Sequence, residues 1–107
     1  MRLYNTLTRR EEIFRPSRGQ LVRIYTCGLT VYARGHIGNF RTFVALDVLR
    51  RALKYEESYE VQQIMNFTDV DDRTIAASRV AEMSLRDYTN QYIEAFREDA
   101  LALGLEP

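Results

Sequence analysis

The sequence predicts an α/β domain in which a short parallel sheet is flanked by helices. Residues 21–26 and 61–67 carry the apolar side chains expected of core strands, and residues 36–55 repeat apolar side chains at helical spacing. Two further helical segments follow the second strand. The order strand, helix, strand, helix, helix is typical of parallel strands joined by a right-handed crossover. Two core strands make a very small sheet.

The segment before the first core strand has a weaker pattern. Residues 3–8 are expected to form a short edge strand. A charged turn and loop is expected over residues 9–19, because Pro16, Ser17 and Gly19 favour irregular backbone.

The long helix predicted over residues 36–55 has a wide apolar stripe, and charged side chains occupy much of its remaining circumference. We expect the stripe to face the core. It consists of Phe40, Phe43, Val44, Val48, Leu49, Ala52 and Leu53.

The two following helices are predicted from their capping residues. Thr68 is followed three positions later by Asp71, which predicts a short helix that continues to about residue 81. This helix is expected to bury Ile75, Ala76 and Val80. Ser84 and Asp87 form a similar start for the last helix, and Gly104 stands where its C-terminal cap belongs. The aromatic residues of this last helix are assigned to its core stripe rather than to a ligand: Tyr88, Tyr92 and Phe96.

The amino-acid composition limits which classes of function are possible. The chain has 107 residues, enough for a single domain, and its 15 Lys and Arg balance 15 Asp and Glu. Zero net charge argues against broad electrostatic capture of nucleic acid. No membrane span or secretory signal is expected, because no sufficiently long apolar segment is present. One cysteine, Cys27, excludes an internal disulfide and favours a reducing, cytoplasmic location.

The most informative segment is the loop over residues 27–39, between the first core strand and the long helix. Open α/β sheets bind ligands at this place. Gly35 and Gly38 permit close approach of a ligand to the backbone, and His36 and Asn39 lie in the first helical turn, where an anion is favoured. The spacing alone leaves two interpretations open: a phosphate site, or a tight turn with a helix-capping histidine.

Four segments together resemble the cysteinyl-tRNA synthetase family of class I aminoacyl-tRNA synthetases. Residues 25–39, with His-Ile-Gly-Asn at their end, resemble the HIGH signature of class I enzymes and its surroundings in this family. Residues 3–9, 41–47 and 66–72 match further family segments in order. The resemblance implies a partial Rossmann-like (HUP-type) nucleotide-binding fold. It also implies that residues 1–107 form one domain, the first half of the catalytic domain.

The resemblance also implies roles for particular residues. His36 and Asn39 are expected to be catalytic and to bind ATP with Mg²⁺, together with Thr30 and Gly38. Asn39 stands where the signature often has its last histidine, and it keeps a hydrogen-bond donor.

The amino-acid pocket is expected to include Cys27, Gly28, Thr68 and Asp69. Cys27 matches the first zinc ligand of the family, whose other ligands come from later in the full-length enzyme, so stable zinc binding by this chain is not expected. For Asp71 and Asp72 the expected role is helix capping.

The function implied is cysteine–tRNA ligation: ATP-dependent activation of cysteine to cysteinyl-adenylate, then transfer to tRNA-Cys. The KMSKS signature and the tRNA-binding domains of the family do not occur in these residues. We therefore expect the chain alone to bind ATP with weak or no catalysis. The alternatives are a non-catalytic phosphate-binding or self-associating half-domain, such as a homodimer, and a fragment of a related ligase that joins cysteine to an amino sugar.

Overall fold

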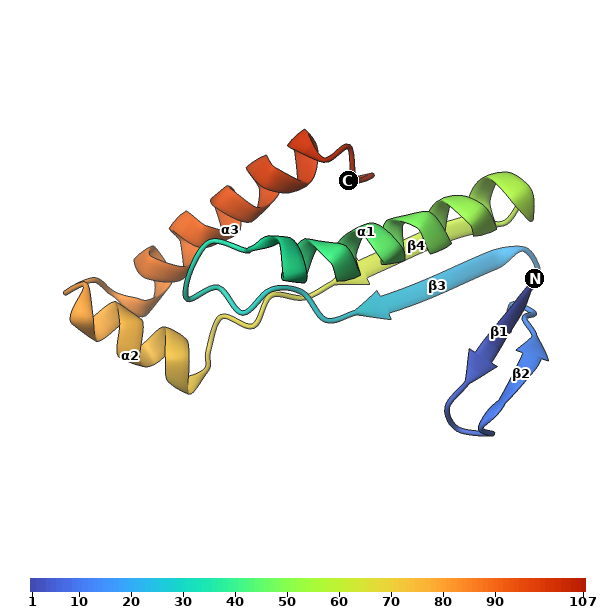
Figure 1. Ribbon diagram of the computed structural model, residues 1–107, viewed down its shortest axis with the longest axis horizontal. Helices are drawn as coiled ribbons and strands as arrows, with labels where there is room; N and C mark the ends of the chain where they lie inside the picture. Colours follow the sequence, from blue (N-terminus) through green and yellow to red (C-terminus); the bar gives the residue numbers. More distant parts are fainter.

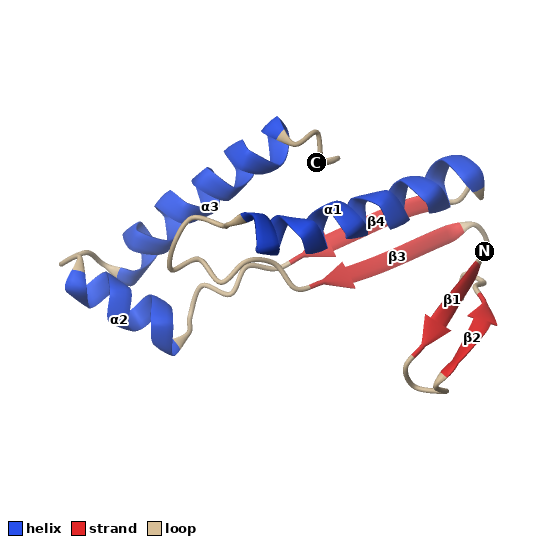
Figure 2. Ribbon diagram, viewed as in Figure 1, coloured by secondary structure: helices blue, strands red, loops and turns tan.

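The computed structural model describes residues 1–107 as eight elements in an elongated arrangement (Figures 1 and 2). They are strands β1 (Arg2–Asn5), β2 (Arg10–Ile13), β3 (Leu21–Thr26) and β4 (Glu60–Met65), helices α1 (Ile37–Arg51), α2 (Asp72–Val80) and α3 (Leu85–Ala102), and the π-helical turn η1 (Ala52–Glu56). No helix is both long enough and apolar enough to cross a bilayer.

The core sheet consists of β3 and β4, which pair in parallel with Leu21 opposite Glu60 and Thr26 opposite Met65. The connection between them runs through α1 and η1 (Figure 1), as the sequence predicts. On one face of the sheet Val22 and Thr26 are buried. On the other face Tyr25 and Ile64 are exposed, so this face is left uncovered.

The hairpin of β1 and β2 is a separate antiparallel sheet and corrects the prediction for residues 3–19. The first strand ends at Asn5, whose side-chain oxygen accepts a hydrogen bond from the Leu7 N–H, and the second strand lies within the predicted loop. The positive φ of Arg9 helps to close the turn. The sequence pattern missed β2 because its residues are mostly charged and make cross-strand contacts, such as Arg2 with Glu11, instead of alternating apolar side chains.

The predicted helix over residues 36–55 is confirmed as α1 continued by η1, but its apolar stripe is only partly buried. Phe40, Phe43 and Leu53 are buried, whereas Val44 and Val48 are 39% and 60% exposed. The reason is that no element of the chain covers the side of α1 on which these two valines lie.

Helix α2 differs from the prediction in its start and in its buried face. Its N-cap is Asp71, which accepts the N–H of Arg73, while the hydroxyl of Thr74 accepts the N–H of Asp71. Thr68 extends the parallel pairing instead: its N–H donates to the carbonyl of Leu29.

The buried residues of α2 are polar rather than apolar. Thr74 and Ser78 are buried, whereas Val80 is 86% exposed, which corrects the expected apolar face. The two buried hydroxyls are satisfied locally, because Thr74 donates to the carbonyl of Asp69 and Ser78 to that of Ile75.

Helix α3 begins and ends as predicted. The hydroxyl of Ser84 accepts the N–H of Asp87, and Gly104 has a positive φ of 73° just beyond the helix. Its aromatic stripe supplies the centre of the core, where the Phe96 ring lies 5.2 Å from Phe43 and 5.5 Å from Phe40, between ring centroids.

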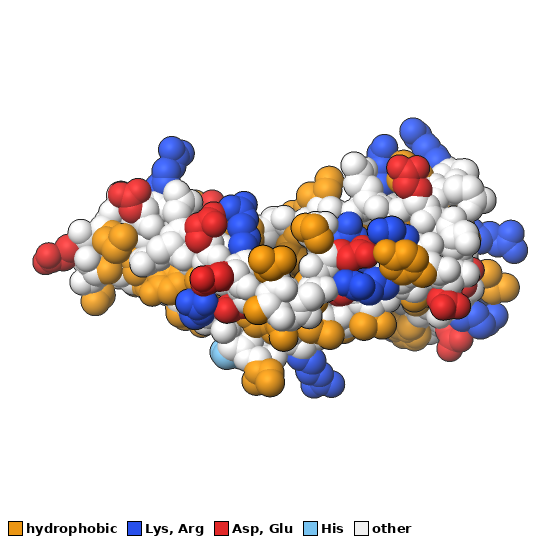
Figure 3. All heavy atoms as spheres, turned by 90° about the horizontal axis from the view of Figure 1, so that it is seen from above, with side chains coloured by type: hydrophobic (Ala, Val, Ile, Leu, Met, Phe, Trp, Pro, Cys, Tyr) orange, Lys and Arg blue, Asp and Glu red, His pale blue; other side chains and the backbone are white.

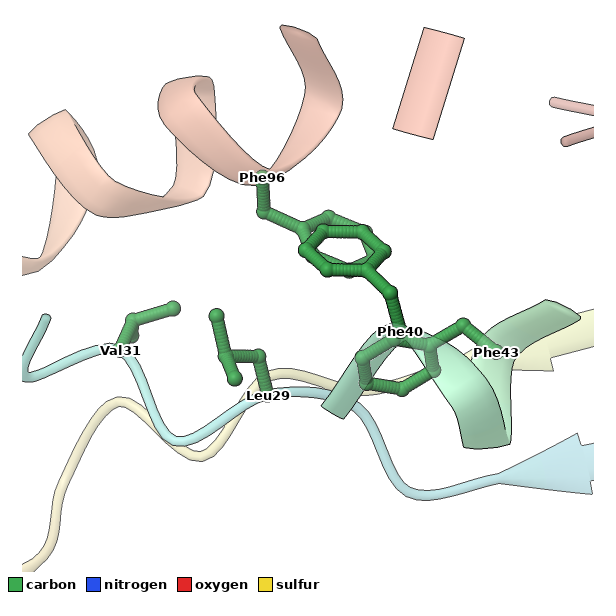
Figure 4. Close-up of a cluster of buried hydrophobic side chains, with 5 residues drawn as sticks. All are labelled: Leu29, Val31, Phe40, Phe43 and Phe96. Atoms are coloured by element: carbon green, nitrogen blue, oxygen red, sulfur yellow. The ribbon is translucent and has the colours of Figure 1, made fainter. Parts of the chain in front are cut away.

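Figure 4 shows Phe96 reaching from α3 toward Phe40, with Leu29 and Val31 on the loop after β3. The core therefore sits at the carboxyl end of the parallel strands, directly against this loop.

Candidate functional site

A cavity of about 350 Å³ lies at the carboxyl end of β3, where the sequence predicts a ligand site. Its walls are formed by the loop after β3, the first two turns of α1 and one residue of α2. Two arginines and a histidine line the cavity, and no carboxylate does. The lining residues are Cys27, Gly28, Leu29, Thr30, Tyr32, Ala33, Arg34, His36, Gly38, Asn39, Thr42, Phe43 and Arg73.

His36 starts α1 through its imidazole ring. Its Nδ1 accepts the N–H of Gly38 at 3.1 Å, so a neutral ring carries its proton on Nε2. Nε2 has no hydrogen-bond partner within the chain. The two interpretations left open by the spacing are therefore compatible, because the capping contact uses one nitrogen and leaves a donor on the other.

Asn39 completes the same cap in the opposite direction. Its Oδ1 accepts the N–H of His36 at 3.0 Å, which leaves its amide NH₂ group without a partner in the chain. The reciprocal cap thus holds two unused donors, from His36 and Asn39, in the first turn of a helix whose N-terminus favours anions. Gly38 lies between them, and a β-carbon there would come within 3.0 Å of the His36 ring.

Cys27, Gly28 and Thr30 line the cavity from the loop. The N–H of Gly28 donates to the side chain of Asn66 at 2.9 Å, and a β-carbon at Gly28 would lie 1.9 Å from the carbonyl oxygen of Asn66. Only glycine fits there. Cys27 is exposed with a free thiol.

Thr68 and Asp69 do not line this cavity. Thr68 is half-buried, and its carbonyl accepts the N–H of Val31, so it fixes the course of the loop. Asp69 is exposed, and the contact made by its backbone carbonyl, to the hydroxyl of Thr74, belongs to the start of α2. The structure thus brings Cys27, Gly28 and Thr30 together with the α1 residues, and leaves these two outside.

Zinc does not fit the residues present. No group of three or more His, Cys, Asp or Glu side chains lies close enough together to hold a metal ion. Cys27 alone supplies one thiolate, whereas a zinc site needs three or four protein ligands.

Sequence analysis did not identify Arg34 as a cavity residue. It donates two hydrogen bonds to Asp99 and one to Glu98, at 2.9–3.1 Å, so it ties the loop to α3. Hydrogen bonding to Asp99, and then to Glu98, raises the pKa of Arg34 above its usual value. The hydroxyl of Tyr88 makes a second tie by donating to the carbonyl of Tyr32 at 2.6 Å.

Arg73 is the other residue that sequence analysis missed. Its guanidinium lies 5.1 Å from the ring centroid of Tyr32, and its Nε donates to Asp71 at 3.1 Å. This hydrogen bond is the largest cause of the raised pKa of Arg73. The pKa of Asp71 is lowered, mainly by the hydrogen bond from the backbone N–H of Arg73 and then by this side-chain hydrogen bond. A signal was available, since a cation in the first turn of a helix faces the unfavourable end of the helix dipole.

A parallel strand, a loop and a helix start that together form a cavity at the carboxyl end of the strands define a class of protein, the open α/β domains. The sequence profile of the class I (C) tRNA synthetase catalytic domain matches residues 13–107. The chain therefore belongs to this family, and its fold is the Rossmann-like α/β fold that the sequence predicts, with a short parallel sheet and flanking helices.

Several curated proteins are similar to almost the whole chain. A cysteine–tRNA ligase of Brachyspira hyodysenteriae is 50% identical over 103 residues, which are 96% of this chain and 22% of that protein. A cysteine–tRNA ligase of Enterococcus faecalis is 44% identical over 107 residues, 100% of this chain and 23% of that protein. A cysteine–tRNA ligase of Methanosarcina acetivorans is 49% identical over 96 residues, which are 90% of this chain and 20% of that protein. The chain thus spans about a fifth of the length of these relatives.

Proposed function

We propose that this chain carries the nucleotide-binding first half of a cysteine–tRNA ligase catalytic domain, organised as one domain. In the whole protein the reaction is activation of cysteine by ATP to cysteinyl-adenylate, followed by transfer to tRNA-Cys. The observation that carries the proposal is the carboxylate-free cavity at the start of α1, where the reciprocal cap leaves a donor on His36 and another on Asn39. The similarity to named cysteine–tRNA ligases supports the choice of substrates.

His36 and Asn39 act on the phosphates of ATP in this proposal. The cysteine carboxylate attacks the α-phosphorus, the bond to pyrophosphate breaks, and negative charge builds on the phosphate oxygens. Fixed donors that face this charge stabilise the transition state, and each is worth about 2.7–4 kcal/mol in comparable sites. Gly38 allows close approach, and Thr30 offers a hydroxyl from the loop after β3. Cys27 and Gly28 belong to the cysteine side of the cavity, while Thr68 and Asp69 support it from outside.

The chain alone is expected to bind ATP with weak or no catalysis, because the KMSKS signature, which supplies charge contacts to the ATP phosphates from the other half of the fold in this family, does not occur in these residues. An amide NMR titration with Mg·ATP tests binding. Shifts confined to residues 35–41 and the cavity wall support the proposal. A spectrum that is dispersed but unchanged at saturating Mg·ATP contradicts it.

The variant His36→Ser separates the two uses of the histidine. Serine is a good N-cap, so α1 should still begin at the same place, but the Nε2–H donor of the imidazole is lost. We expect the backbone spectrum of α1 to persist while the affinity for Mg·ATP falls about tenfold or more, as for loss of a hydrogen bond to a charged group. Unchanged affinity would assign His36 to capping alone. Cysteine-dependent exchange of pyrophosphate into ATP then measures residual activation.

A further inference from the structure

The positive charges that line the cavity differ in how far the chain already uses them. Arg34 is bound by two carboxylates of α3: its Nε donates to Asp99, its Nη2 to Asp99 and Glu98, and only Nη1 makes no hydrogen bond. Arg73 has one ionic partner, Asp71, and uses only Nε for it. The two terminal amino groups of Arg73 have no hydrogen-bond partner in the chain. Of the two lining guanidinium groups, Arg73 therefore keeps more donors available, two terminal amino groups against the single Nη1 of Arg34.

The position of this guanidinium is fixed on two sides. The carboxylate of Asp71 accepts both the backbone N–H and Nε of Arg73, at 3.0 and 3.1 Å. The ring of Tyr32 lies against the guanidinium, and the Tyr32 carbonyl is itself held by the buried Tyr88. An arginine held in this way has already lost much of its side-chain freedom, so a ligand that binds it incurs a smaller entropic cost.

The stability of α2 does not explain an arginine at this position. A cation in the first turn is disfavoured by the helix dipole, and an acidic residue would serve the helix better. The ring of Tyr32 and the carboxylate of Asp71 compensate for the charge, and the side chain lines the cavity while remaining 60% exposed. The arrangement instead resembles a preformed fork, the geometry that binds carboxylate and phosphate oxygens in pairs.

We propose that Arg73 is an oxyanion-binding residue of this cavity, which donates its two terminal amino groups to the carboxylate or phosphate oxygens of the bound ligand. This inference rests on the proposed function and deepens it, because Arg73 faces the same cavity as His36 and Cys27 from a different element. The oxyanion has two possible sources, the carboxylate of the amino acid and the phosphates of the nucleotide. Their chemistry toward a guanidinium is the same, so the experiment distinguishes them.

The test measures binding of four probes by amide NMR: Mg·ATP, inorganic pyrophosphate, cysteine, and cysteamine, which is cysteine without its carboxylate. The variants are Arg73→Met, which removes the charge, and Arg73→Lys, which keeps the charge and removes the fork. Arg79→Met is the matched control, because it removes one exposed cation of the same helix away from the cavity. Thermal unfolding of each variant shows whether it is folded.

The expected result is that Arg73→Met weakens binding of at least one oxyanion about tenfold or more, that Arg73→Lys gives a smaller loss, and that Arg79→Met stays within about twofold of the original chain. Weaker binding of Mg·ATP and pyrophosphate assigns Arg73 to the phosphates. Loss of the preference for cysteine over cysteamine assigns it to the carboxylate.

Two outcomes overturn the inference, and they can be told apart. If the original chain binds the probes and Arg73→Met binds all of them as tightly as Arg79→Met does, Arg73 is only a surface ion pair and the proposed function stands. If the original chain binds none of the four, the proposed function fails and this inference fails with it.

Discussion

The side chains around the cavity have structural tasks as well as candidate chemical ones. The Nδ1 of His36 caps α1, whereas its Nε2 has no partner in the chain. Likewise the side-chain oxygen of Asn39 takes part in the cap, whereas its NH₂ group has no partner. Such double use means that an alanine substitution would disturb folding and binding together. Variants that keep one contact and remove the other are therefore the informative ones.

Gly28 is expected to tolerate no side chain. In Gly28→Ala the new methyl group would lie 1.9 Å from the backbone oxygen of Asn66, so β3 and β4 would have to separate at their carboxyl ends. We expect a loss of about 1–3 kcal/mol in the free energy of unfolding, measured by urea denaturation. The neighbouring Cys27→Ala, at an exposed position, is the control and should change stability by less than about 0.5 kcal/mol. Equal free energies of unfolding for Gly28→Ala and Cys27→Ala would contradict the close contact between Gly28 and Asn66.

Tyr88 is expected to stabilise the fold through its hydroxyl. Tyr88→Phe removes the hydroxyl of a buried tyrosine and leaves the carbonyl of Tyr32 without its partner, which should cost about 1 kcal/mol of unfolding free energy. Tyr4→Phe removes the hydroxyl of a 63% exposed tyrosine and serves as the control. Urea denaturation monitored by circular dichroism measures the free energy of unfolding of both variants. An equal loss in Tyr88→Phe and Tyr4→Phe would show that the hydrogen bond to Tyr32 contributes nothing.

The parts of the structure that the sequence predicts are those fixed by local signals. β3, α1 and α3 follow from apolar spacing and from caps such as Ser84, and the pairing of His36 with Asn39 in one turn follows from their separation by three residues. The start of α2 was misplaced because Thr68 and Asp71 both fit a capping pattern, and only the parallel pairing of Thr68 with Thr30 decides between them. Arg73 was missed because its contact with Tyr32 joins residues far apart in the chain.

At the scale of elements, α3 holds the loop after β3 in place. Arg34 binds Asp99 and Glu98, and Tyr88 binds the carbonyl of Tyr32, while the other end of the loop is paired with Thr68. The loop that forms most of the cavity wall is therefore fixed from two directions, by α3 and by the extension of β4.

Arg34→Met should loosen this loop without unfolding the chain. We expect faster amide hydrogen exchange in residues 29–36 and little change in β3 and β4, since the ion pairs are at the surface and hold only the loop. Arg97→Met is the control, because the partner of Arg97 is Glu94 on the same helix. Unchanged exchange in the loop would mean that Tyr88 and Thr68 suffice to hold it.

The segment after α3 is attached to α1 by Glu106, and this attachment should depend on pH. A hydrogen bond from Tyr55, and then the charges of Lys54 and the nearby arginines, lower the pKa of Glu106 below its usual value. A carboxylate with a lowered pKa contributes stability that is present above its unfolded pKa, about 4.3, and is lost as the pH falls through the lower folded value.

The thermal midpoint should therefore fall in acid more steeply for the original chain than for Glu106→Gln. At pH 7 the variant should be the less stable of the two, because its neutral amide attracts Lys54 and the arginines less strongly. Midpoints measured from neutral to acid pH check this. Parallel curves would contradict a role of Glu106 in the acid response.

At the scale of the whole molecule, the chain exposes more surface than a compact protein of its size. Its radius of gyration is 16.6 Å, whereas about 13 Å is typical for this length. Its accessible surface is 7911 Å², against about 6,200 Å² expected from its mass. The excess is comparable to the area that one partner buries in a large, permanent interface. Figure 3 shows hydrophobic side chains exposed among both signs of charge on one face.

We predict that this surface makes the chain associate with itself, as a homodimer or a larger species. Tyr25 and Ile64 lie on the uncovered face of the sheet, and both strands have an open edge. Sedimentation velocity should show a mass that rises with concentration, and Ile64→Lys should reduce the effect more than Val80→Lys, at a valine of α2 that is even more exposed (86% against 58%). A single monomeric species up to the solubility limit would contradict the prediction.

The parallel pairing of β3 with β4 also has a consequence for synthesis on the ribosome. Leu21 pairs with Glu60, so β3 is translated well before its partner exists. At about 5–20 residues per second, the wait lasts roughly 2–8 seconds. During that time the hairpin and α1 can form from neighbouring residues, but the sheet and the cavity at its end cannot. A nascent chain stalled within α1 would therefore present β3 as an unpaired apolar strand, the kind of segment that chaperones bind.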